Sequence, residues 1–345
     1  MKTTINKLYP DIWLQIFEYF NVNDLFFSLM NVTEVADEVL FNSNHRFRLR
    51  GLVIDVHNRT LPKKLLLCQL ISLELNQESY IDIVGQCSEL RALKLVGQLE
   101  WTISLLKNVA HSIVRLEQLV VIASGIDLLY DLLATIVSFP SLYRLEIHAD
   151  QLEQRLKTSF SFLSQTKVEQ FILQSCSLIT WSDLSYMLPA LLNIRFLELT
   201  MFSYNNTSMY SFAFLKLRCI SLILVDASFK QISQLVMTTP SLTKIKLSGI
   251  VDSEEFIINH KWLELFESCP SLASAIVHLS LQQDINFFYS SIFEIALNEI
   301  GLNLQCVDND CEYYLDEKSC NRWWSLSGII IKRHGQVVKK PQTTC

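Results

Sequence analysis

A short pattern of apolar and polar positions recurs along most of this chain. Its clearest copy is residues 142–147 (LYRLEI), which has the form Leu-x-x-Leu-x-Leu. Residues two positions apart on a strand share one face, so Leu145 and Ile147 are predicted to enter a core together. The middle apolar residues of four successive copies follow one another at intervals of 26 residues: Leu119, Leu145, Phe171 and Leu197. This regular spacing indicates a repeated structural unit.

Further copies extend the pattern on both sides of these four. Their centres are Leu73 and Leu93 upstream and Ile220 and Ile245 downstream, and the last copy is predicted as Ile276, Leu279 and Leu281. Segments with helical periodicity lie between the copies, for example residues 128–139 and 230–238. Because one strand and one helix cannot bury their apolar faces alone, neighbouring units are expected to stack around a continuous core. The pattern therefore predicts an α/β fold.

The repeated phrase resembles the leucine-rich-repeat family, whose periods run from about 20 to 29 residues. The resemblance covers residues 46–283 and implies a horseshoe-shaped solenoid with a parallel sheet on its concave face. Residues 284–345 are then a C-terminal repeat, cap and tail, with a last strand starting near Trp323. The alternative, a set of unrelated buried strands in an ordinary α/β domain, explains the regular spacing less well.

Residues between the inward-facing leucines would point outward from the concave face, which solenoids use to bind protein partners. The candidate target-binding residues are Lys94, Arg144, Glu146, His148, Phe196, Glu198, Lys244 and Lys246. For each of them the alternative is a solvated strand residue with no binding role.

The first forty residues follow a different pattern. Pro10 and Asp11 predict the start of a helix, because proline and an acid both favour the first turn. Helical spacing then gives a wide apolar face that includes Trp13, and Asn23 or Asp24 can cap a second helix. A third helix is expected around residues 33–41.

This segment resembles the F-box, the helical module that docks on the adaptor subunit of cullin-RING ubiquitin ligases. The match rests on the phrase at residues 16–20 (IFEYF), on Asp24-Leu25, and on the opening residues 8–11 (LYPD). The resemblance implies a module over residues 1–45 with adaptor-binding residues Leu8, Pro10, Asp11, Ile12, Ile16, Phe17, Phe20 and Leu25.

The two resemblances together imply a non-catalytic substrate-recognition subunit of an SCF-type ubiquitin ligase. Its partners would be the ligase adaptor and a target protein held by the repeats. One alternative is a leucine-rich-repeat scaffold in which the N-terminal helices only cap the solenoid. Another is a regulator of a small GTPase that acts through the same concave face. The segment is rich in large aromatic residues, which favours a partner surface over a simple cap.

Composition narrows the classes of partner and location. Half of the 345 residues are apolar and 19% are charged, which predicts an ordered chain with a large core. The net charge of −6 argues against nucleic acid and acidic membranes as partners. The sequence contains neither a membrane-spanning apolar run nor a secretory leader, and its nine cysteines are scattered. We therefore expect a cytoplasmic location, with the nucleus as the alternative.

The sequence offers no catalytic motif, so we expect a protein that is not an enzyme and needs no cofactor. Cys306, Cys311 and Cys320 lack the Cys-x-x-Cys spacing of zinc sites and have no histidine between them, so no metal is expected. The basic run at residues 45–50 is interpreted as the start of a strand that continues over residues 52–56, rather than as a nucleic-acid patch.

Overall fold

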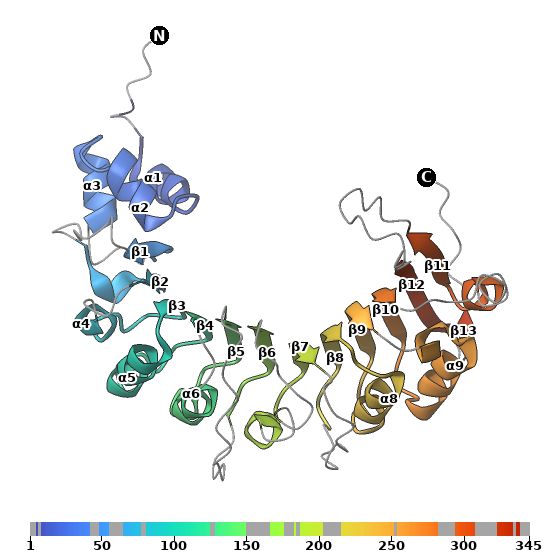
Figure 1. Ribbon diagram of the computed structural model, residues 1–345. Helices are drawn as coiled ribbons and strands as arrows, with labels where there is room; N and C mark the ends of the chain where they lie inside the picture. The colour runs from blue at the N-terminus through green and yellow to red at the C-terminus, as the bar shows by residue number, and fades with distance from the viewer. Residues whose placement is uncertain are drawn as a thin grey trace, which may run out of the picture. The chain divides into compact units, whose positions relative to one another are not determined.

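The structure is a computed structural model of the chain, and it describes most of the predicted elements. The described residues are 5, 8–41, 48–54, 65–76, 81–124, 128–149, 166–175, 183, 187–202, 215–251, 254–281, 294–307, 323–333 and 336–338. The chain forms two compact units, the first made of residues 1–159 and 166–168 and the second of residues 160–165 and 169–345. Both units contain strands, mostly parallel, and helices (Figure 1), which confirms the predicted α/β class.

The first unit begins with three short helices, as predicted, but the second helix begins at Val22 and is capped by Asn21 rather than by Asn23 or Asp24. They are α1 (Pro10–Phe17), α2 (Val22–Ser28) and α3 (Glu34–Phe41). Proline occupies the first position of α1. The side chain of Asn21 caps α2 by accepting a hydrogen bond from the Asp24 N–H (2.8 Å). At the start of α3 the Thr33 hydroxyl group accepts a hydrogen bond from the Ala36 N–H (2.9 Å). The small core of these helices consists of Trp13, Phe17, Val22, Leu25, Ala36, Val39 and Leu40.

The helices are joined to the sheet through strand β1 (Leu52–Ile54). The Asn23 side chain donates to the Val53 carbonyl oxygen (3.1 Å) and accepts from the Val53 N–H (3.0 Å). Next to it the Val22 N–H donates to the Arg50 carbonyl oxygen (2.8 Å). The amide of Asn23 therefore takes the place of a neighbouring strand, and it satisfies backbone groups that an edge strand leaves open.

The parallel sheet of the first unit follows the chain in the order β1-β2-β3-β4-β5. The other strands are β2 (Ser72–Leu75), β3 (Ala92–Gly97), β4 (Gln118–Ala123) and β5 (Arg144–Ala149), and the connecting helices are η2 (Leu67–Gln69), α4 (Ile81–Val84), α5 (Leu99–Val109) and α6 (Leu129–Ile136). The register places Leu73, Leu93, Leu119 and Leu145 side by side, and all four are buried. The helices cover the face to which these leucines point (Figure 1).

The second unit repeats this arrangement. Its parallel strands are β6 (Gln170–Ser175), β7 (Phe196–Phe202), β8 (Cys219–Val225), β9 (Lys244–Val251) and β10 (Ser274–Leu281), with η4 (Leu188–Leu191), α8 (Phe229–Met237), η5 (Glu254–Ile257) and α9 (Asn259–Ser268) between them. A capping box formed by Ser228 and Gln231 starts α8. The helix predicted over residues 230–238 is thus present, shifted by one residue.

The sheet of the second unit ends in antiparallel strands, and the sequence pattern predicted only the one near Trp323. They are β11 (Leu302–Val307), β12 (Trp323–Arg333) and β13 (Gln336–Val338). Strand β12 lies between β10 and β11 and also pairs with β13. The strand predicted near Trp323 is therefore β12, and a reversal of chain direction lets it pair along the whole of β10.

The register of β10 corrects the last copy of the repeated phrase. Ala275 and Val277 lie beside Ile245 and Leu247, so the copy is Leu272, Ala275 and Val277. The prediction centred on Leu279 is wrong, because Ile276 lies on the opposite face and is only half-buried. A small alanine at the central position hides the pattern in the sequence.

The division into two units near residue 168 does not coincide with either of the sequence boundaries expected at residues 45 and 283. In the part of the chain that the structure describes, none of the helices combines the length and apolar character needed to cross a membrane.

Gly249 in β9 provides a test of the strand packing in the second unit. Its φ of +114° is unfavourable for other residues, and an added Cβ would collide with the carbonyl group of Leu224 on β8. Gly249→Ala is expected to lower the free energy of unfolding by about 2 kcal/mol, as measured by urea denaturation. Gly85→Ala is the matched control, because its Cβ would meet nothing closer than the Asp82 oxygen at 3.9 Å. Equal effects of the two substitutions would contradict this packing.

Candidate functional site

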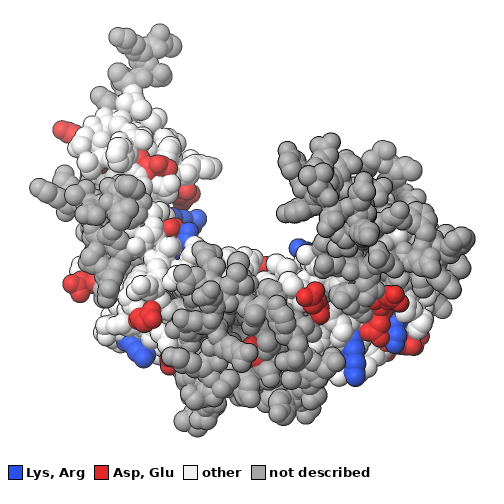
Figure 2. Space-filling model, viewed as in Figure 1, with Lys and Arg blue, Asp and Glu red and all other residues white. Residues whose placement is uncertain are grey.

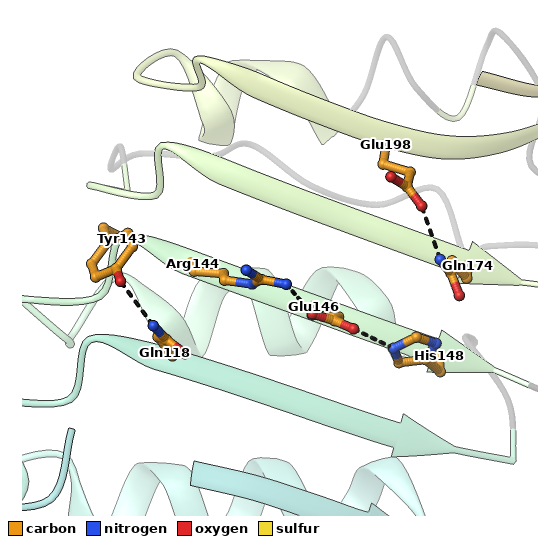
Figure 3. A network of polar contacts seen from close by, with 7 residues as sticks. All are labelled: Gln118, Tyr143, Arg144, Glu146, His148, Gln174 and Glu198. Atoms are coloured by element: carbon orange, nitrogen blue, oxygen red, sulfur yellow. Dashed lines mark hydrogen bonds and ion pairs between the residues drawn. The ribbon is translucent and has the colours of Figure 1, made fainter. Parts of the chain in front are cut away.

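The sheet face away from the helices carries a row of charged side chains in the first unit. Arg144, Glu146 and His148 project from alternate positions of β5, whereas Leu145 and Ile147 between them are buried (Figure 3). Arg144 Nη2 donates to Glu146 Oε2 (2.8 Å), and His148 Nε2 lies 2.7 Å from Glu146 Oε1. One carboxylate therefore holds two basic side chains in line along the strand.

This arrangement changes the acidity of Glu146. Its partial burial would raise the pKa of the carboxyl group, but hydrogen bonds and charges from Arg144 and His148 have the opposite effect and together outweigh it. The pKa of Glu146 consequently lies below its ordinary value. The carboxylate is thus held ionised and oriented, so a partner would meet a preformed pattern of charge.

Other polar groups on the same face are also paired. Lys94 on β3 lies two strands from Glu146 in the register, and its Nζ is 3.2 Å from Glu74 Oε2 on β2. Gln118 Nε2 donates to the Tyr143 hydroxyl group (2.8 Å; Figure 3). The structure thus places the predicted residues Lys94, Arg144, Glu146 and His148 on one face of the first unit.

In the second unit the other four predicted target-binding residues share a face as well. Phe196 is aligned with Lys244, and Glu198 with Lys246, each pair being separated by one residue of β8. Gln174 Nε2 donates to Glu198 Oε1 (2.9 Å; Figure 3). Phe196 and Glu198 are half-buried, whereas both lysines are exposed. This face is therefore more open around β9 than around β7.

The N-terminal helices present a second candidate surface, which consists of exposed apolar side chains. These are Tyr9 (77% exposed), Ile12 (39%), Tyr19 (89%), Phe20 (38%), Phe27 (88%) and Met30 (39%). We call this set the apolar N-terminal surface. Exposed aromatic side chains such as these are enriched in protein interfaces.

The predicted adaptor-binding residues divide into two groups in the structure. Pro10, Asp11, Ile12 and Phe20 are exposed and Leu8 and Ile16 are half-buried, but Phe17 and Leu25 are buried inside the first unit. The role of those two in the structure is to hold the helices together. Helical periodicity alone did not separate these groups, because it shows which residues share a face and not what covers that face.

Four members of the surface were absent from the predicted set, namely Tyr9, Tyr19, Phe27 and Met30. Tyr9 precedes α1 and Tyr19 follows it, and on α2 the buried residues are Val22 and Leu25. Phe27 therefore lies off the buried face of α2. The sequence signal that could have identified Phe27 is an aromatic residue that does not follow the helical spacing of the buried residues.

The charged residues within the three N-terminal helices and their connections are all acidic. Residues 8–41 contain no lysine or arginine, and the charged spheres over α1 to α3 are red in Figure 2. The acids are Asp11, Glu18, Asp24, Glu34, Asp37 and Glu38.

Two of the described thiols, those of Cys87 and Cys269, are buried. Burial raises the pKa of Cys87 to about 12 and also raises that of Cys269, so both thiols stay protonated and unreactive. Among the described residues no group of three histidine, cysteine or acidic side chains is placed to hold a metal ion. Cys311 and Cys320 lie outside the described residues.

The hydrogen bonds to Glu146 predict a pH-dependent contribution to stability. Because its folded-state pKa lies below the unfolded-state value, the ionised group stabilises the fold above about pH 4.5 and loses this effect as the pH falls through the folded-state pKa. Wild type should therefore lose more stability than Glu146→Gln on acidification, measured as Tm between about pH 6 and pH 3. Arg144→Gln should give an intermediate loss. Parallel curves for wild type and Glu146→Gln would refute this role.

Comparison with known proteins adds no further information on identity. No protein-family model matches the chain, and a search of curated proteins finds no significant match. The functional interpretation therefore depends on the residues and geometry described above.

Proposed function

We propose that this chain is a non-catalytic substrate-recognition subunit of an SCF-type cullin-RING ubiquitin ligase. In this proposal residues 1–45 form an F-box-like module that docks on the ligase adaptor, and residues 46–283 form a divergent leucine-rich-repeat solenoid. The observation that carries the proposal is the apolar N-terminal surface, defined above by six large exposed side chains.

The exposure of these side chains supports docking, because helices that only covered the edge of the sheet would not require exposed aromatic side chains. The three helices already have a core of their own, and Asn23 and Val22 join them to the edge of the sheet. Tyr9, Tyr19 and Phe27 take part in neither contact and leave more than three-quarters of their surface open. Aromatic side chains of this kind are typical anchors of protein interfaces.

The charged face of the sheet supports the second part of the proposal, in which the repeats bind a target protein. Its side chains are fixed in rows by the strand register, and several are oriented further by hydrogen bonds such as those of Glu146. A target held on this face would be presented to the ligase at high effective concentration, so that ubiquitin transfer becomes a proximity effect. This chain would supply binding and position, and the chemistry would belong to other subunits.

A second candidate function is a protein-binding scaffold with no role in ubiquitin transfer. The bond pair between Asn23 and Val53 favours it, because this contact shows the helices covering the open edge of β1. In that case the apolar N-terminal surface would bind some other partner, and removal of residues 1–45 would leave target binding intact.

The adaptor contact can be tested with the full chain. Replacing both Ile12 and Phe20 with Ala is expected to weaken binding to purified adaptor at least about tenfold, because exposed apolar anchors would be lost. Binding is measured by isothermal titration calorimetry, and circular dichroism checks that the variant is folded.

The matched control is Met237→Ala, which removes a 61% exposed apolar side chain from α8 and should leave adaptor binding unchanged. If the wild-type chain does not bind the adaptor at all, the ligase role is wrong and the scaffold role remains. If both variants bind as wild type does, the docking surface has been misplaced.

A further inference from the structure

On the sheet face of the second unit, two lysines have no counter-charge among the described residues. Lys244 and Lys246 project from the same side of β9, and both are exposed, whereas Ile245 and Leu247 are buried. Among the described residues, neither ammonium group has a hydrogen bond or an ion pair. We call these two residues the lysine pair.

The neighbouring strands place only neutral residues beside the lysine pair. Lys244 is flanked by Cys219 on β8 and by Ser274 on β10, and Lys246 is flanked by Ser221 and Ile276. Glu198 is a full strand further away and is engaged by Gln174. The two positive charges thus repel one another and are not neutralised by the sheet on which they stand.

On the corresponding face of the first unit, by contrast, basic side chains are paired with acids. There Lys94 pairs with Glu74 at 3.2 Å, and Arg144 pairs with Glu146 at 2.8 Å. Among the described residues, Lys94 and Arg144 are thus neutralised by acids of their own sheet, whereas Lys244 and Lys246 are not. The lysine pair is consequently available to an external anion.

Apolar side chains lie next to the lysine pair on the side of β10 and β12. The register runs from Lys246 to Ile276 and then to Ile329, and it places Ile331 beside Ser274 in the neighbouring row. These three isoleucines are half-buried and share the face of the lysines. Adjacent strands are about 4.8 Å apart, so positive charge and apolar surface lie within about 10 Å of each other.

We propose that this surface of β9, β10 and β12 binds a protein segment in which acidic and apolar residues are interspersed. Carboxylates of the segment pair with Lys244 and Lys246, and its apolar side chains cover Ile276, Ile329 and Ile331. Charge complementarity selects the acid, and the isoleucines select a polypeptide over a free anion. The inference rests on the proposed function, since it names the chemical class of target that the repeats would hold.

The test uses the full chain and a synthetic peptide of about 20 residues, with Glu and Leu three or four positions apart. A second peptide carries Gln in place of every Glu. Fluorescence anisotropy should show binding of the Glu peptide that weakens between about 0.05 M and about 0.5 M salt. Binding of the Gln peptide should be at least about tenfold weaker.

Variants locate the binding surface. Replacing both Lys244 and Lys246 with Glu should weaken binding of the Glu peptide at least about tenfold, because like charges then face one another. The matched control is Lys230→Glu, which reverses an exposed lysine on α8 in the same unit and should have little effect.

The remaining outcomes overturn the proposal. Equal binding of the two peptides, no binding of either, or an equal effect of Lys230→Glu would each show that the lysine pair does not select an acidic segment. Binding to vesicles containing phosphatidylserine without binding to the Glu peptide would assign the surface to anionic lipid instead. Adaptor binding is measured separately, so loss of the ligase role would not be confused with failure of this inference.

Discussion

Each parallel strand of this protein depends on its neighbours for both its backbone hydrogen bonds and the burial of its leucines. The register that aligns Leu73, Leu93, Leu119 and Leu145 satisfies the two requirements together, because matched backbone groups bring matched apolar side chains side by side. An isolated unit could satisfy neither requirement. The regular spacing in the sequence is thus the consequence of a packing constraint.

The same constraint leaves one side of the outermost parallel strands, β1 and β10, without a parallel neighbour, and the chain covers that side differently in its two units. In the first unit the Asn23 side chain and the N-terminal helices cover β1. In the second unit β12 reverses direction and pairs along the full length of β10, with β11 on its other side. Both devices satisfy backbone groups that would otherwise pair with another chain.

Because the leucines occupy one side of each strand, the other side is free to vary. That face holds the Arg144–Glu146–His148 row in the first unit and the lysine pair in the second. The N-terminal helices divide their side chains in a similar way, since Phe17 and Leu25 are in their core while Tyr19 and Phe27 remain exposed. Stability and candidate binding surfaces are thus carried by different residues of the same elements.

The sequence by itself determined the α/β class, most strand positions, the three N-terminal helices and the side of each strand on which the candidate residues lie. These features depend on local periodicity, which a pattern of apolar positions records directly. Only the tertiary structure decided that Phe17 and Leu25 are buried and that Ala275 rather than Leu279 centres the last copy. It also decided that Lys94 is paired while, among the described residues, Lys244 and Lys246 are not. Each of those facts depends on which residue lies on the adjacent strand or helix, and local periodicity does not identify that neighbour.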